Sequence, residues 1–72
     1  MRIGQLAQLV GVDAQTIRFY EQQGLLPPPD RQENGYRIYS EKHGERLAFI
    51  RRCRILDLPL AEIHELKRFQ DD

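Results

Sequence analysis

The sequence has one cysteine, no tryptophan and no long apolar stretch among its 72 residues. A single cysteine excludes a disulfide within the chain and a zinc site built from several thiolates. The apolar runs are far shorter than the roughly 20 residues that cross a bilayer, and no signal-peptide core follows Met1. These absences predict a cytoplasmic protein that has no membrane partner and no metal site of its own.

Net charge is also absent, because 11 Lys and Arg residues balance 11 Asp and Glu residues. A balanced chain is a poor candidate for indiscriminate binding to polyanions. The charges are nevertheless separated: residues 1–56 carry nine basic and six acidic side chains, whereas residues 57–72 carry two and five. Four basic residues fall close together: Arg46, Arg51, Arg52 and Arg54. This basic run is equally compatible with a solvated helix face.

Length and composition predict one small folded domain. The chain is 40% hydrophobic and 31% charged, which is typical of a globular protein and not of a disordered one. A chain of this size buries only about 60% of its unfolded surface, so its stability margin is small. The sequence offers no nucleophile–base pair, phosphate-cradling glycine loop or carboxylate cluster, so we do not expect an enzyme.

The N-terminal end predicts two short helices. Four apolar side chains recur at helical spacing: Ile3, Leu6, Ala7 and Val10. Gly11 is a typical helix stop, and Asp13 is a typical N-cap for a second helix that runs to about Gln23, before Gly24. Two short helices joined by a tight glycine-containing turn are typical of a helix-turn-helix, although plain helical hairpins share the pattern.

The middle and C-terminal parts predict a ribbon followed by two more helices. The prolines at 27–29 cannot continue a helix, and Asn34-Gly35 is a typical tight turn because both residues tolerate positive φ. Residues 36–39 predict a short strand, preceded by a loop that contains Arg31. Ser40 can cap a helix over residues 41–56, and a last helix follows over residues 60–69 with three inward side chains: Leu60, Ile63 and Leu66. The expected fold is mainly α, a winged helix-turn-helix with a small β-hairpin wing and two further helices.

The predicted helix 14–23 has an unusual outward side. Steps of about 100° per residue place four side chains on that side: Gln15, Arg18, Phe19 and Gln22. Arginine pairs with guanine, glutamine pairs with adenine, and an aromatic ring contacts a thymine methyl group, so this side suits a DNA major groove. Ile17 and Tyr20 point toward the core, and Thr16 at the edge can reach a phosphate. The alternative is that Phe19 packs on a neighbouring loop.

Basic and phenolic side chains recur outside this helix. Tyr36 and Arg37 on the predicted wing, and Arg31 before it, can hold DNA phosphates without recognising sequence. Arg54 on the third helix can do the same. The alternative for the wing is a solvated hairpin whose charges serve solubility.

The remaining candidate ligands favour structural roles. Cys53 shares one arc of the third helix with three apolar side chains: Phe49, Ile50 and Leu56. A buried structural cysteine is therefore favoured over a metal ligand or a nucleophile. His43 and His64 lie on different predicted helices without thiols or carboxylates at ligand spacing, so we expect them on helix surfaces.

Five segments together closely resemble the N-terminal DNA-binding domain of the MerR family of transcriptional regulators: IGQLA, TIRFYE, GLL with the following prolines, NGYRIY, and FIRRCRILDLPLAEI. The resemblance covers nearly the whole chain. It implies that the helix over residues 14–23 enters the major groove and that the wing over residues 30–39 contacts the DNA backbone. The implied groove contacts are Gln15, Thr16 and Arg18. The implied phosphate contacts are Tyr36 and Arg37, supported by Tyr20, Arg31 and Arg54.

The resemblance also implies partners. Members of the family bind pseudo-palindromic promoters as homodimers, act with RNA polymerase, and activate transcription by bending and untwisting the DNA. The sequence is most similar to the heavy-metal branch, whose cadmium- and lead-responsive members sense the ion through cysteines that lie beyond the end of this chain. A long dimerisation helix also follows there. We therefore expect residues 1–72 to be one DNA-binding module, a monomer as given, without the dimerisation helix, the sensing segment or a cofactor.

One residue departs from the family pattern, and two alternative functions stay open. Pro59 stands where the family often has a Ser or Thr cap, and proline is acceptable in a first helical turn. An excisionase-like architectural DNA binder shares the small winged fold. A helical protein–protein adaptor that docks through Phe19 and leucines is the other alternative.

Overall fold

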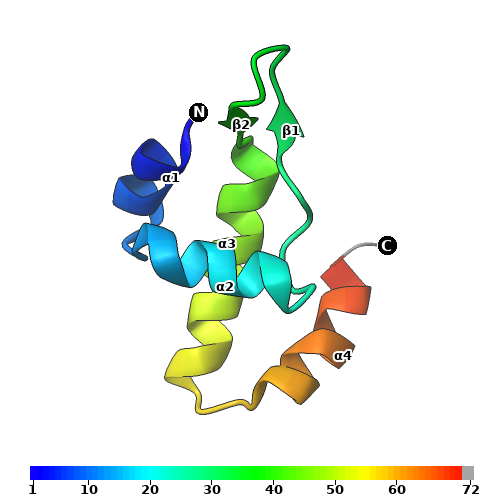
Figure 1. The fold of residues 1–72 in the computed structure, drawn as a ribbon. Helices are drawn as coiled ribbons and strands as arrows, with labels where there is room; N and C mark the ends of the chain where they lie inside the picture. The colour runs from blue at the N-terminus through cyan, green and yellow to red at the C-terminus, as the bar shows by residue number, and fades with distance from the viewer. Residues whose placement is uncertain (71–72) are drawn as a thin grey trace.

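The computed structural model describes residues 1–70 as four helices and one antiparallel hairpin (Figure 1). The helices are α1 (Ile3–Val10), α2 (Ala14–Gln22), α3 (Glu41–Ile55) and α4 (Leu60–Gln70). Strand β1 (Asp30–Arg31) pairs with β2 (Arg37–Ile38) to form the wing. This arrangement confirms the predicted mainly α, winged helix-turn-helix fold. Within residues 1–70, no helix has both the length and the apolar character that a membrane span needs.

The turn between α1 and α2 forms as the capping residues predict. Gly11 adopts a left-handed conformation with φ of 71°, and its amide donates to the Ala7 carbonyl at 2.9 Å. The Asp13 carboxylate accepts a hydrogen bond from the Thr16 amide at 2.7 Å. Hydrogen bonding to Thr16, through its side chain and its amide, lowers the pKa of Asp13. Because an ionised cap accepts more strongly than a neutral one, this contact fixes the start of α2.

Two small apolar clusters hold the helices together. The first contains five buried residues: Leu6, Ile17, Leu26, Tyr39 and Leu47. The second contains four: Leu25, Ile50, Cys53 and Ile63. Tyr20 is half-buried and packs against both clusters, as its phase on α2 predicts. Since α3 supplies residues to both clusters, it is the central element on which α1, α2 and α4 are assembled.

The wing is a short ladder closed by a four-residue turn. Asp30 lies opposite Ile38, and Arg31 lies opposite Arg37. The Gly35 amide donates to the Gln32 carbonyl at 2.9 Å, and Gly35 has a φ of 87°. The prediction that Arg31 lies in a loop is wrong, because cross-strand pairing with Arg37 makes its segment a strand. The predicted tight turn at Asn34-Gly35 forms with positive φ at Gly35, and the Asn34 side-chain oxygen accepts from the Tyr36 amide at 3.2 Å.

Three predicted positions are wrong, each for a local reason. His43 is buried, since its Nδ1 accepts from the Ser40 amide at 3.0 Å and its ring packs edge-on against Tyr39. Leu56 is 72% exposed because α3 ends at Ile55 and the chain leaves the inward arc. Leu66 is exposed, because the inward arc of α4 passes through Ile63 and the half-buried Lys67.

The basic run of α3 serves the fold itself. Three of its guanidinium groups donate to backbone carbonyl groups at 3.1 Å: Arg46 to Leu25, Arg51 to Val10, and Arg54 to Leu58. The Leu25 and Val10 carbonyls lie at or just beyond helix ends, where such acceptors lack partners within their own helix. The arginines therefore satisfy carbonyl groups of neighbouring elements, a role that the charge pattern alone did not predict.

Candidate nucleic-acid interface

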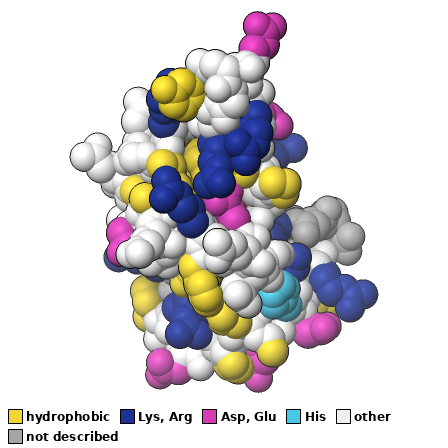
Figure 2. Space-filling view, viewed as in Figure 1, with side chains coloured by type: hydrophobic (Ala, Val, Ile, Leu, Met, Phe, Trp, Pro, Cys, Tyr) yellow, Lys and Arg dark blue, Asp and Glu magenta, His cyan; other side chains and the backbone are white. Residues whose placement is uncertain are grey.

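Arg18, Arg31 and Arg37 line two adjacent open clefts between α2 and the wing. The first cleft, of about 420 Å³, is completed by Arg2, Ile3, Gly35 and Tyr36. The second, of about 390 Å³, is completed by Glu21, Gln22, Pro28 and Pro29. Figure 2 shows basic side chains gathered between the wing and α2, with an acidic one among them. We call the set Arg2, Arg18, Arg31 and Arg37 the arginine face.

The outward side of α2 has the composition that helix phase predicts. Gln15 and Arg18 are exposed, and the Phe19 side chain is 43% exposed. Thr16 is half-buried beside Asp13, whose carboxylate accepts its amide hydrogen. Ile17 is fully buried on the opposite side. The helix thus presents a guanidinium, an amide and an aromatic ring to its surroundings.

The wing side chains reach toward the same surface. Tyr36 is 50% exposed, and the Arg2 guanidinium carbon lies 3.7 Å from the centre of its ring. Arg31 donates to the Gly35 carbonyl at 3.1 Å, which ties this guanidinium across the base of the turn. Arg2 was not predicted as part of a site. Its position comes from tertiary contact between the start of α1 and the wing, which has no local signal in the sequence.

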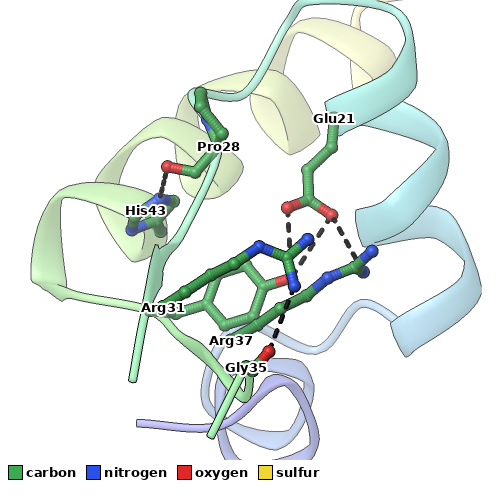
Figure 3. A network of polar contacts seen from close by, with 7 residues as sticks. Glu21, Pro28, Arg31, Gly35, Arg37 and His43 are labelled. Atoms are coloured by element: carbon green, nitrogen blue, oxygen red, sulfur yellow. Dashed lines mark hydrogen bonds and ion pairs between the residues drawn. The ribbon is translucent and has the colours of Figure 1, made fainter. Parts of the chain in front are cut away.

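A carboxylate joins α2 to the wing (Figure 3). The Tyr39 hydroxyl lies 3.1 and 3.2 Å from the two Glu21 oxygens, and the Arg37 guanidinium lies 4.0 Å from the same carboxylate. Burial, followed by the charge of Glu21 and its hydrogen bond, raises the pKa of Tyr39, with Arg37 acting in the opposite direction. Glu21 therefore fixes the wing relative to α2. This contact has no local signal in the sequence, because Glu21 and Tyr39 lie 18 positions apart.

A second contact fixes the proline segment against α3 (Figure 3). His43 accepts from the Ser40 amide through Nδ1, so its Nε2 carries the hydrogen and donates to the Pro28 carbonyl at 3.4 Å. The chain between α2 and β1 is thereby anchored at its middle. Together with Glu21, this contact sets where the wing leaves the helical body.

Arg54 lies apart from the arginine face. It sits near the C-terminal end of α3, whereas the wing adjoins the N-terminal end of that helix (Figure 1). In this view α2 crosses α3 between the wing and the α3–α4 turn. The predicted contact residues are consequently distributed on both sides of α2. Among residues 1–70, no three His, Cys, Asp or Glu side chains are grouped so as to hold a metal ion.

A family model described as MerR HTH family regulatory protein matches residues 1–70. The chain belongs to the MerR family. This agrees with the fold, in which a helix-turn-helix is followed by a two-stranded wing and two helices.

This MerR-family domain is similar in sequence or structure to three regulators. It is 49% identical over 71 residues to the HTH-type transcriptional regulator ZntR homolog of Haemophilus influenzae. This match covers 99% of this chain and 53% of the ZntR homolog. The structure of the transcription regulator PbrR691 from Ralstonia metallidurans CH34 in complex with lead(II) superposes on this domain with a TM-score of 0.92 and 51% sequence identity. The match covers 99% of this chain and 56% of PbrR691. The structure of HiNmlR, a MerR-family regulator that lacks the sensor domain, bound to promoter DNA, superposes with a TM-score of 0.88 and 27% sequence identity. The match covers 97% of this chain and 53% of HiNmlR. The chain therefore spans about half the length of the relatives it matches.

Proposed function

We propose that this domain binds double-stranded promoter DNA sequence-specifically, with the outward side of α2 in the major groove and the wing on the phosphate backbone. The observation that carries this proposal is the position of Arg18. It lines both clefts together with Arg31 and Arg37 of the wing, so a base-contacting side chain and phosphate-contacting side chains share one surface. The promoter complex of the similar regulator HiNmlR supports the same class of ligand.

The side chains of α2 are assigned by their hydrogen-bonding chemistry. Arg18 donates two parallel hydrogen bonds to O6 and N7 of a guanine, which is the commonest specific contact in the major groove. Gln15 pairs with an adenine edge, and Phe19 contacts a thymine methyl group or a sugar. Thr16, at the edge of the groove, donates to a phosphate, and Tyr20 supports α2 from its inner side.

The phosphate contacts flank α2. Tyr36, Arg31 and Arg37 hold one strand of the duplex through the wing. Arg54 contacts the other strand from the α3–α4 side, because α2 lies between these two regions. Such contacts fix the orientation of the protein and carry no sequence information by themselves.

In a protein of the relatives' length, we propose a cytoplasmic homodimeric regulator that acts with RNA polymerase and distorts the promoter. Control by a heavy-metal ion such as lead or cadmium, through residues outside this chain, is supported by the lead(II)-bound structure of PbrR691. We assign no catalytic reaction to this domain. Heavy-metal resistance genes are the expected targets.

The test begins with selection of preferred sites from a pool of random duplexes, followed by titration of the parent and single variants. Arg18→Ala should lose about 1–3 kcal/mol on the selected site and should stop discriminating at one base pair. Arg37→Ala should instead weaken binding to all sequences and lower the slope of log affinity against log salt by about 0.9.

Arg52→Ala is the matched control, because it removes the same charge. Arg52 is exposed and lies about 200° around α3 from the buried Ile50, on the side away from α2. It should bind as the parent does. A protein–protein adaptor would predict that Arg18→Ala and Arg37→Ala also behave as the parent, and that result would refute the proposed function.

A further inference from the structure

We propose that Arg2 is an additional phosphate-binding residue, and that the first cleft of the arginine face takes one phosphodiester group of the DNA backbone. This inference rests on the proposed function and extends its contact surface to the start of α1. Arg2 lines the cleft with Arg18 and Arg37, and it stacks on Tyr36 of the wing.

The backbone of Arg2 is held in place by neighbours on both sides. Its amide donates to the Gln5 side chain at 3.1 Å, and its carbonyl accepts from the Leu6 amide at 3.1 Å. The preceding residue, Met1, exchanges two hydrogen bonds of 2.6 Å with the backbone of Tyr39 beside the wing. Arg2 is consequently an ordered part of the domain, and little conformational entropy remains to be lost at its backbone when a ligand binds.

The stacking on Tyr36 orients the guanidinium group. With its carbon 3.7 Å above the ring centre, the guanidinium interacts through its face. Its N–H donors lie in the plane of the group and so are directed to the side, where they can reach an oxyanion. An aromatic ring thus holds the cation in position while its hydrogen-bonding edge stays available for a phosphate.

The charge of the cleft indicates the class of ligand. Within the described residues, its lining contains four arginines and no acidic side chain. Guanidinium groups crowded on one surface repel each other, and an anion bound among them relieves that repulsion. Glu21 lines only the second cleft, where its carboxylate lies 4.0 Å from Arg37. A phosphodiester supplies the negative charge that no side chain lining the first cleft provides, and its oxygens are strong acceptors for guanidinium groups.

The test uses the 72-residue chain and a mixed-sequence duplex of about 20 base pairs, because a phosphate contact does not depend on sequence. Arg2→Ala should lower the slope of log affinity against log salt by about 0.9. The ratio of the parent's affinity to the variant's affinity should therefore fall about 3.5-fold between 50 and 200 mM salt. Arg2→Lys retains the charge and should keep the parent's slope with weaker binding, since lysine cannot present the planar fork. Arg52→Ala is the charge-matched control and should keep both slope and affinity.

The outcomes separate the two proposals. If Arg2 only stabilises the wing, Arg2→Ala and Arg2→Lys will both keep the parent's salt slope while lowering the melting temperature, and the inference is overturned. If Arg18→Ala and Arg37→Ala weaken binding as expected but Arg2→Ala does not, only the role of Arg2 fails. If Arg18→Ala binds the selected site as the parent does, the proposed function itself fails.

Discussion

Replacing Tyr39 with phenylalanine removes one hydroxyl group from the contact between the wing and α2. The ring is 1% exposed, and its hydroxyl lies 3.1 and 3.2 Å from the oxygens of Glu21. In the variant the Glu21 side chain, which is 13% exposed, would retain the longer contact with Arg37, 4.0 Å away. A hydrogen bond to a charged group contributes about 1.5–3 kcal/mol, so Tyr39→Phe should lose a large part of the stability of so small a domain.

The assay is urea unfolding followed by circular dichroism. With a denaturant dependence of about 1–1.5 kcal/mol per molar urea, the midpoint should fall by about 1–3 M at pH 7. The variant also predicts a pH effect. Because burial and Glu21 raise the pKa of Tyr39 above its usual 10.0, the folded domain holds this proton more tightly than the unfolded chain does. The resulting stability is complete below about pH 10 and is lost as pH rises through the folded-state pKa.

The difference between parent and variant should therefore narrow above about pH 10, since other titrating groups are common to both proteins. Absorbance titration of the phenolate supplies an independent check. Tyr39 should ionise above its usual pH of 10.0, and Tyr39→Phe should remove that step. Equal urea midpoints, together with a Tyr39 phenolate that ionises at its usual pH, would refute the proposed role of the Glu21–Tyr39 contact.

Two further changes test the helix-turn-helix. Asp13→Ala should destabilise the domain at neutral pH. This difference should shrink as pH falls through the lowered pKa of Asp13, because the extra stability that comes from ionisation of the cap is lost there; unfolding curves at pH 7 and pH 2 measure it. Gly11→Ala should lose about 1–2 kcal/mol from its positive φ. Its new Cβ, 2.9 Å from the flexible end of Arg51, should also displace the Arg51 hydrogen bond to the Val10 carbonyl. Gly24→Ala is the control with similar φ and a nearest contact of 3.7 Å, and equal losses in both variants would contradict the close approach.

The helices could be predicted from the sequence because their signals are local. Asp13 and Gly11 mark a boundary by their own chemistry, and the phase of α2 correctly separates the buried Ile17 from the exposed Phe19. The errors occur where tertiary contacts decide. Periodicity placed Leu66 inward, whereas Lys67 turns in and its ammonium donates to the Gly24 carbonyl at 2.9 Å.

The candidate site was predictable in part for the same reason. Arg18 follows from helix phase, and Arg37 follows from its place on the predicted strand. Arg2 and Tyr39 lie 37 positions apart in the chain and come beside the same wing only in the folded state. No spacing rule connects such residues, so the stacked guanidinium and the buried hydroxyl required the structure.

Recognition of the major groove by Arg18 can be tested by methylation interference with dimethyl sulfate on the selected duplex. This reagent methylates guanine N7 in the major groove and adenine N3 in the minor groove. N7 methylation at one guanine should block binding by the parent and should have no effect on the residual binding of Arg18→Ala. Interference confined to adenine N3, or the same guanine pattern for both proteins, would contradict major-groove recognition by Arg18.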